Sequence, residues 1–176
     1  MFKHAIAAAA VATLALALAS VSAQADTTGA SFQVKMTILK SCSVTAGSAS
    51  DINLGNAVLS TATNQTGSNT ISVTCSKTTP YSIGLAPSTA NGGTANGTGA
   101  MSSVANSATN TDKVPYALYS NSGYSTVWGN TVGTGSNVVP GVGTGAAFTH
   151  TVYAKNVNAN FTPDSYADTV TVTVTY

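Results

Sequence analysis

The chain has 176 residues and few charges: six Lys and Arg stand against five Asp and Glu, for a formal net charge of +1. Nucleic acid selects partners with a strongly basic surface, so this balance argues against a nucleic-acid-binding protein. Its length suits a single domain with a sizeable core.

Residues 1–25 have the pattern of a secretory signal peptide. A short polar start precedes a run of mostly Ala, Leu and Val at 5–19, and small polar residues follow. The apolar run is too short to span a bilayer comfortably. We therefore predict an exported protein that is cleaved after Ala25, with the bond after Ala23 as the alternative. No later segment resembles a membrane helix.

The mature chain would be almost uncharged. Removal of the leader takes Lys3, one of the six basic residues, and leaves five lysines against five aspartates, with no Arg and no Glu. A neutral surface rich in Thr, Ser, Asn and Gly repels other copies weakly. Such a surface suits a protein that associates with itself.

Short runs of alternating apolar residues recur along the mature chain, and no helical period persists. Side chains alternate across a strand, so each run predicts a half-buried β-strand. Turn-rich segments such as 87–110 and 129–145 separate the runs, which indicates an all-β sandwich or barrel. The predicted strands, in chain order, are 32–38, 69–75, 81–85, 113–119, 148–153 and 168–176.

The first run, 32–38, places Phe32, Val34, Met36 and Ile38 on one face. It could be an ordinary first strand of its own domain, or a segment that pairs with another copy. Its alternation leaves both interpretations open. Its end is also open, since Ile38 could belong to the domain's own first strand.

Two cysteines follow, Cys42 and Cys75. In an exported protein an even count predicts a disulfide. The bond would close a loop of about 34 residues and stabilise the fold by roughly 3–4 kcal/mol in the chain-entropy view. A catalytic or metal-binding thiol pair is the weaker alternative, because the spacing matches no metal motif.

The middle of the chain holds two irregular features. Pro115 falls inside the run 113–119, and because proline has no N–H for a ladder, we predict an edge strand or a strand start there. The polar, low-complexity residues 91–111 predict a mobile surface loop.

The last run, 168–176, places Val170, Val172, Val174 and Tyr176 on one face and threonines on the other. If the chain ends at Tyr176, any strand beside this one must come from elsewhere. With the run at 32–38, two strand-like ends favour a protein that pairs with copies of itself.

Residues that could carry chemistry are sparse. His150, the only histidine of the mature chain, has no acid or nucleophile near it in sequence. Phosphate loops, nucleophile elbows and metal-spaced histidine pairs are absent from the sequence. We therefore expect no enzyme activity, no cofactor and no metal.

Several polar and aromatic residues allow two interpretations. Asp164 and Asp168 flank Tyr166 and could suggest a cation site, although turn and strand-start roles are favoured because oxygen cages need more carboxylates. Tyr166 itself fits a tyrosine corner. Trp128 with Tyr124 could form a sugar-stacking platform, but packing is favoured.

Several further motifs occur in a fixed order along the chain. They are Cys42-Ser-Val44, Leu54-Gly55-Asn56, Ile71–Cys75, Thr79-Pro80-Tyr81, Leu85, Val114–Tyr119, Val127-Trp128-Gly129, Val152-Tyr153 and Tyr166–Tyr176. In this order they resemble the spore coat protein U domain, the pilin domain of the archaic chaperone–usher pathway of Gram-negative bacteria. The family usually has Phe where Leu54 stands.

The resemblance implies an immunoglobulin-like β-sandwich that lacks its last strand and is completed by donor-strand exchange. Residues 26–38 would be an N-terminal donor extension, and 39–176 the pilin domain. The donor side chains would be Phe32, Val34, Met36 and Ile38. The acceptor groove would involve Val170, Val172, Val174 and Tyr176.

The function implied is that of a structural pilus subunit, exported through the periplasm to the cell surface, for adhesion and biofilm formation. Its partners would be identical or related pilin subunits, a periplasmic chaperone and an outer-membrane usher. The alternative is a surface or tip adhesin that binds a glycan or an abiotic surface through loops such as 91–111.

Overall fold

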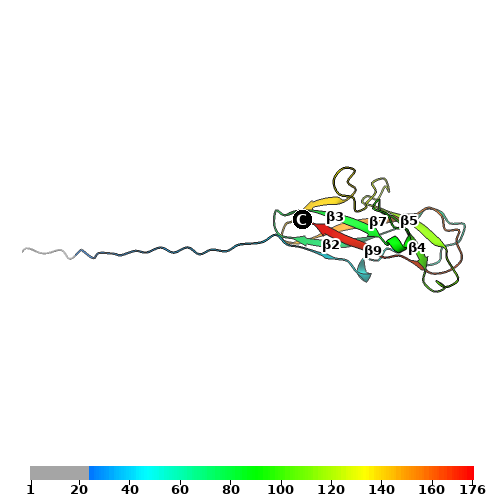
Figure 1. Cartoon of the computed structure of the whole chain (residues 1–176), viewed down its shortest axis with the longest axis horizontal. Coiled ribbons are helices and arrows are strands. Elements are labelled where there is room, and N and C mark those ends of the chain that lie inside the picture. The colour runs from blue at the N-terminus through cyan, green and yellow to red at the C-terminus, as the bar shows by residue number, and fades with distance from the viewer. Residues whose placement is uncertain (1–23) are drawn as a thin grey trace, which may run out of the picture. The chain divides into compact units, whose positions relative to one another are not determined.

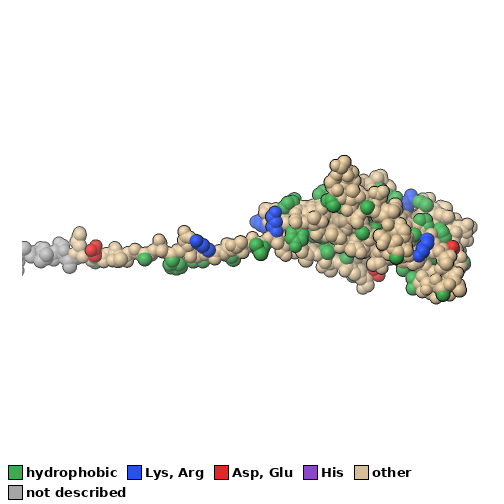
Figure 2. All heavy atoms as spheres, viewed as in Figure 1, with side chains coloured by type: hydrophobic (Ala, Val, Ile, Leu, Met, Phe, Trp, Pro, Cys, Tyr) green, Lys and Arg blue, Asp and Glu red, His purple; other side chains and the backbone are tan. Residues whose placement is uncertain are grey.

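The computed structural model describes residues 24–176. The predicted signal peptide lies outside the described residues except for Gln24 and Ala25. The chain divides into two units, of which the first ends at Thr37 and the second covers Ile38–Tyr176. In the first unit, residues 24–37 are exposed and form no helix or strand, so the predicted strand at 32–38 is not present. Figure 2 shows hydrophobic side chains on the surface of this segment.

The second unit is built from strands and short turns of 3-10 helix, which confirms the all-β prediction. Its predicted runs at 69–75, 81–85, 113–119 and 148–153 all fall on strands. The elements are β1 (Cys42–Thr45), η1 (Ser48–Ser50), β2 (Gln65–Cys75), β3 (Pro80–Pro87), η2 (Thr89–Asn91), β4 (Thr98–Ser103), β5 (Lys113–Tyr119), β6 (Val139–Val142), β7 (Ala147–Asn156), β8 (Tyr166–Ala167) and β9 (Val170–Thr175).

The strands form two antiparallel sheets, one of six strands in the order β1-β2-β7-β5-β4-β8 and one of three in the order β6-β3-β9. Figure 1 shows β9 alongside β3. The register pairs Leu85 with Val172 and Ile83 with Val174. The last predicted strand is therefore real, but it starts at Val170 and stops before Tyr176.

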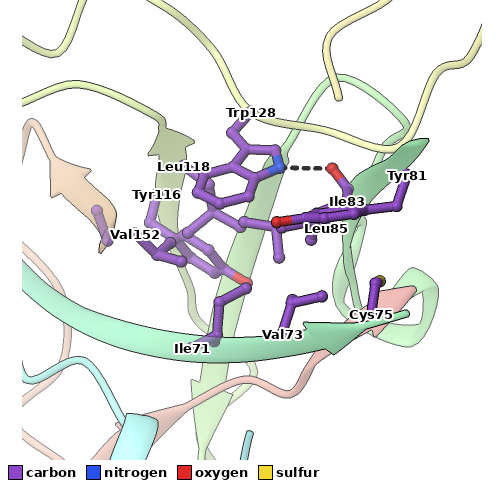
Figure 3. Packing of buried hydrophobic residues seen from close by; sticks show 11 residues of the cluster. Ile71, Val73, Cys75, Tyr81, Ile83, Leu85, Tyr116, Leu118, Trp128 and Val152 are labelled. Carbon is purple, nitrogen blue, oxygen red and sulfur yellow. Dashed lines mark hydrogen bonds between the residues drawn. The ribbon is translucent and has the colours of Figure 1, made fainter. Parts of the chain in front are cut away.

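The core lies between the sheets, and Trp128 is the largest of its fully buried side chains (Figure 3). Its indole Nε1 donates a hydrogen bond of 2.8 Å to the carbonyl of Ile83. The side chain is 1% exposed, so the packing interpretation of Trp128 is confirmed and a sugar platform there is excluded. The other core residues are Ile71, Val73, Cys75, Tyr81, Ile83, Leu85, Tyr116, Leu118, Val152 and Ala154.

The predicted disulfide between Cys42 and Cys75 is present. These residues are register partners in the β1–β2 ladder, so the bond fixes the start of the short strand β1 onto the end of β2. Cys75 belongs to the buried core, while Cys42 is partly buried and packs against that core.

Two segments predicted to be irregular contain strands. β4 lies within 91–111 and β6 within 129–145, so the prediction of one long mobile loop at 91–111 is wrong for its central part. Their sequences, Thr-Gly-Ala-Met-Ser-Ser and Val-Pro-Gly-Val, are rich in small and turn-forming residues. Pairing with neighbouring strands outweighs these local preferences.

Pro115 does not mark an edge strand, because β5 lies between β4 and β7 in the sheet. The β5–β7 pairing covers only Ala117–Tyr119, however, while Pro115 pairs with Ala100 of β4. The missing N–H therefore falls where β5 has a strand on one side only. There, the side-chain amide of Asn156 donates to the Pro115 carbonyl at 2.7 Å.

Tyr166 forms the predicted tyrosine corner. Its hydroxyl donates to the carbonyl of Thr162 at 2.6 Å, four residues upstream, and accepts from the Asn110 amide at 2.8 Å. These bonds fix the turn that leads into β9.

Candidate interaction site: the seam between β1 and β9

Two strand edges without a partner lie close together in the second unit. In the described part of the chain, β9 pairs only with β3 and β1 pairs only with β2, and each is the terminal strand of its sheet. The two strands are near one another but share no ladder. We call this gap the β1–β9 seam. An unpaired edge presents backbone N–H and C=O groups that another strand can bind.

The side chains along the seam are apolar. On β9, Val170, Val172 and Val174 are half-buried and alternate with exposed threonines, and on β1, Val44 has the same intermediate exposure. The three valines and Val44 pack against the core cluster. Contacts between side chains on neighbouring strands stabilise a sheet. These half-buried residues form a row, and the side chains of a strand added at this edge would cover it.

Three apolar residues outside β1 and β9 are also partly exposed. Ile52 and Leu54 follow η1, and Met101 comes from β4; all three pack against the core while remaining partly exposed. They also line a cavity of about 540 Å³, which Tyr166 and the 159–165 turn border. The cavity is large enough for apolar side chains from another segment.

The predicted site residues occupy different environments. Val170, Val172 and Val174 come together on the seam, but Tyr176 lies beyond the end of β9 and is 57% exposed. In the first unit, Phe32, Val34, Met36 and the adjoining Ile38 are between 77% and 89% exposed.

Asp168 anchors the start of β9. Its carboxylate accepts from the Tyr116 hydroxyl at 2.6 Å, from the Asn91 amide at 2.8 Å and from the Ser88 backbone N–H at 3.3 Å. Burial, together with this carboxylate, raises the pKa of the Tyr116 hydroxyl far above its usual value. The hydroxyl therefore stays protonated and keeps donating, which supports the strand-start role of Asp168.

Asp164 holds the turn before β8. Hydrogen bonds from the Ser103 hydroxyl at 2.5 Å and from the Asn110 amide at 3.0 Å lower the pKa of Asp164 to about 2. Within residues 24–176, no group of three or more His, Cys, Asp or Glu side chains is placed to hold a metal ion.

Asp164→Asn is expected to reduce stability at neutral pH and to flatten its loss in acid. The folded pKa of about 2 lies below the ordinary value of 3.8, so the folded state binds fewer protons between these pH values. The contribution of Asp164 is therefore complete above about pH 4 and is lost as the pH falls toward 2. Urea midpoints measured from pH 7 to pH 2 should converge for the two proteins at the acid end. Curves that stay parallel would contradict this account.

His150 has a packing role. Its Nε2 lies 3.0 Å from the Tyr81 hydroxyl, and its ring meets Phe148, Trp128 and Tyr81 edge to face. Burial lowers the pKa of the imidazole, which favours the neutral ring.

The profile of the spore coat protein U domain matches residues 28–173. The chain belongs to the spore coat protein U family. No curated protein matches it. The family match begins within the exposed first unit and ends inside β9, so it covers the run 32–38 and the first part of the run 168–176.

A solved structure resembles the fold of this spore coat protein U domain. It is a chain of the CsuC–CsuE chaperone–tip adhesion subunit pre-assembly complex, from the archaic chaperone–usher Csu pili of Acinetobacter baumannii. The TM-score is 0.50 at 21% sequence identity, and the match covers 80% of this chain and 40% of that one. The chain therefore spans less than half the length of the protein it matches.

Part of the partly exposed apolar surface of this spore coat protein U domain escaped the sequence-based prediction. Ile52, Leu54 and Met101 lie outside the runs predicted as strands, and β4 was not expected at all. Leu54 was noted only as a motif residue. The segment 51–56 could have been suspected from Ile52 and Leu54, which alternate with polar residues.

Within residues 24–176, the structure has no helix with the length and hydrophobicity that a membrane span requires.

Proposed function

We propose that this protein is a structural subunit of a chaperone–usher pilus and that it polymerises non-covalently by donor-strand complementation. Residues 32–38 of one copy would add a strand to the β9 edge of the next copy. Backbone hydrogen bonds along that edge would give affinity, and the alternate side chains would give specificity.

The observation that carries this proposal is the β1–β9 seam, where an unpaired edge borders half-buried Val170, Val172 and Val174. A strand bound there must present apolar side chains at every second position. Phe32, Val34, Met36 and Ile38 have that spacing and are almost fully exposed. Burying each would contribute roughly 1.5–3 kcal/mol before ordering costs are subtracted.

The same seam suggests the assembly partners. Until the next subunit arrives, an apolar seam with a free edge invites wrong pairing, so a periplasmic chaperone would cover it and an outer-membrane usher would exchange the chaperone for a subunit. Membership of the spore coat protein U family supports this proposal. Export would depend on the predicted leader, and the assembled fibre would serve adhesion and biofilm formation at the cell surface.

Electrophoresis of purified surface fibres tests the proposal. Without heating, the sample should give a ladder of subunit multiples, because strand-shared contacts dissociate slowly. Boiling without a reducing agent should collapse the ladder to one subunit, since the cysteines pair within the chain. A ladder that survives boiling, or protein that runs only as a monomer before heating, would refute non-covalent polymerisation.

A further inference from the structure

The outer face of the six-stranded sheet carries a second surface feature, separate from the seam. β5 and β7 are neighbours there, with Ala117 opposite Lys155 and Tyr119 opposite Tyr153. The buried residues of β5 alternate with these positions, so Lys113 and Tyr119 lie on the outer face with Ala117. One sheet face therefore combines lysine and tyrosine side chains.

Three tyrosines cluster at one end of this face. The ring of Tyr124 meets Tyr119 and Tyr153 edge to face, with centroids 5.6 Å and 6.2 Å apart. The ammonium group of Lys155 lies 5.8 Å from the centroid of the Tyr124 ring. The aromatic cluster and this cation thus form one continuous surface.

Tyr124 adopts a backbone conformation that bulky residues avoid, with φ of 51°. The surrounding loop maintains it, because the Asn121 carboxamide accepts from the backbone N–H groups of Ser125 and Thr126 and the Asn121 carbonyl accepts from the Tyr124 N–H. Backbone strain of this kind persists where the structure enforces it and is concentrated at binding sites. It is an independent sign that the position of the Tyr124 ring matters.

A cleft of about 660 Å³ opens on the same face, and both Lys113 and Lys155 line it together with Tyr119. Lys113 is held in place: its ammonium group donates to the Asn91 side-chain oxygen at 2.6 Å, and Asn91 donates in turn to Asp168 at 2.8 Å. Lys113 and Ala117 are four positions apart, about 13 Å along the strand, and Lys155 lies opposite Ala117. The two cations therefore stand at separated points of one elongated surface.

We propose that this face, Lys113, Lys155, Tyr119, Tyr124 and Tyr153, binds an acidic polysaccharide. Carboxylates on the polymer would pair with the two ammonium groups. Its sugar rings, whose C–H faces are apolar, would lie against the tyrosines. A chain molecule suits the spacing of the lysines better than a compact anion does, because their backbone positions are about 13 Å apart along the strand direction. The site lies within one domain, so the proposal does not depend on polymerisation.

Binding of the purified mature protein to immobilised polygalacturonate tests this site, with uncharged dextran as the reference polymer. We expect binding to polygalacturonate that weakens at high salt, and little binding to dextran. Lys113→Gln and Lys155→Gln should each lower the affinity at least about fivefold, and together far more. The control Lys77→Gln removes the same charge from the turn between β2 and β3 and should change the affinity less than about twofold.

Tyr124→Asn separates the aromatic contribution from charge. Asparagine tolerates a positive φ, so the loop should keep its shape while the ring is lost, and the affinity should fall with an unchanged thermal midpoint. Equal losses for Lys77→Gln and Lys155→Gln, equal binding to dextran, or full binding by Tyr124→Asn would each overturn the proposal. A normal fibre ladder from the same variants would show that such a failure leaves the pilus proposal intact.

Discussion

Val34→Asp is expected to abolish fibre formation while leaving the fold of its own domain unchanged. Val34 is 89% exposed, so the domain that carries it loses no packing. In the proposed fibre the same side chain is buried in the seam of a neighbour. Aspartate there would forfeit about 1.5–3 kcal/mol of burial and would leave a carboxylate uncompensated. A total of about 4 kcal/mol corresponds to a thousandfold weaker subunit contact.

Gln33→Asp is the matched control, since it places the same charge one residue away. In a strand, neighbouring side chains point to opposite faces, so Asp at position 33 should face solvent and fibres should form. Surface fibres are counted by electron microscopy, and the thermal midpoint of each purified subunit checks its fold. If the Val34 variant forms normal fibres and the Gln33 variant does not, the register is shifted by one residue; if both form fibres, 32–38 is not the donor strand.

The strands most visible in the sequence are those buried on one face. β2, β3, β5 and β7 carry Ile71, Ile83, Leu118 and Val152 in the core, and burial of alternate positions imposes the period of two that the sequence displays. β4 and β6 have no such period. β4 pairs with β5 and β6 pairs with β3 through backbone hydrogen bonds. Such bonds do not depend on the side chains, so they produce no pattern in the sequence.

The candidate sites could be predicted from the sequence to different degrees, because only residues in an alternating strand leave a pattern in it. The alternation of Val170, Val172 and Val174 predicts a half-buried strand, and the structure has this strand at the edge of its sheet. Met101 packs against the core from β4, a strand whose sequence shows no alternation that could have predicted it. Tyr124 was paired with Trp128 in the sequence, but the indole is buried and Tyr124 joins Tyr119 and Tyr153 instead.

Replacing Cys42 and Cys75 together with alanine is expected to destabilise the domain by about 3–4 kcal/mol, because the closed loop restricts the unfolded chain. For a domain of this size the thermal midpoint should fall by roughly 6–16 °C. Loss of the disulfide should loosen β1, the strand that borders one side of the seam. β1 has four residues and pairs with β2 alone, and the disulfide fixes its first residue. Fibre yield should therefore fall with stability.

A reducing agent provides the matched control for this variant. Dithiothreitol should bring the midpoint of the unaltered protein close to that of the double variant and should leave the double variant unchanged, since only the former has a bond to break. Equal midpoints for the two proteins without reductant would mean that β1 is held by its ladder and by Val44 packing on the core. β1 would then keep its place beside the seam without the covalent link, and the disulfide would contribute nothing to the proposed acceptor site.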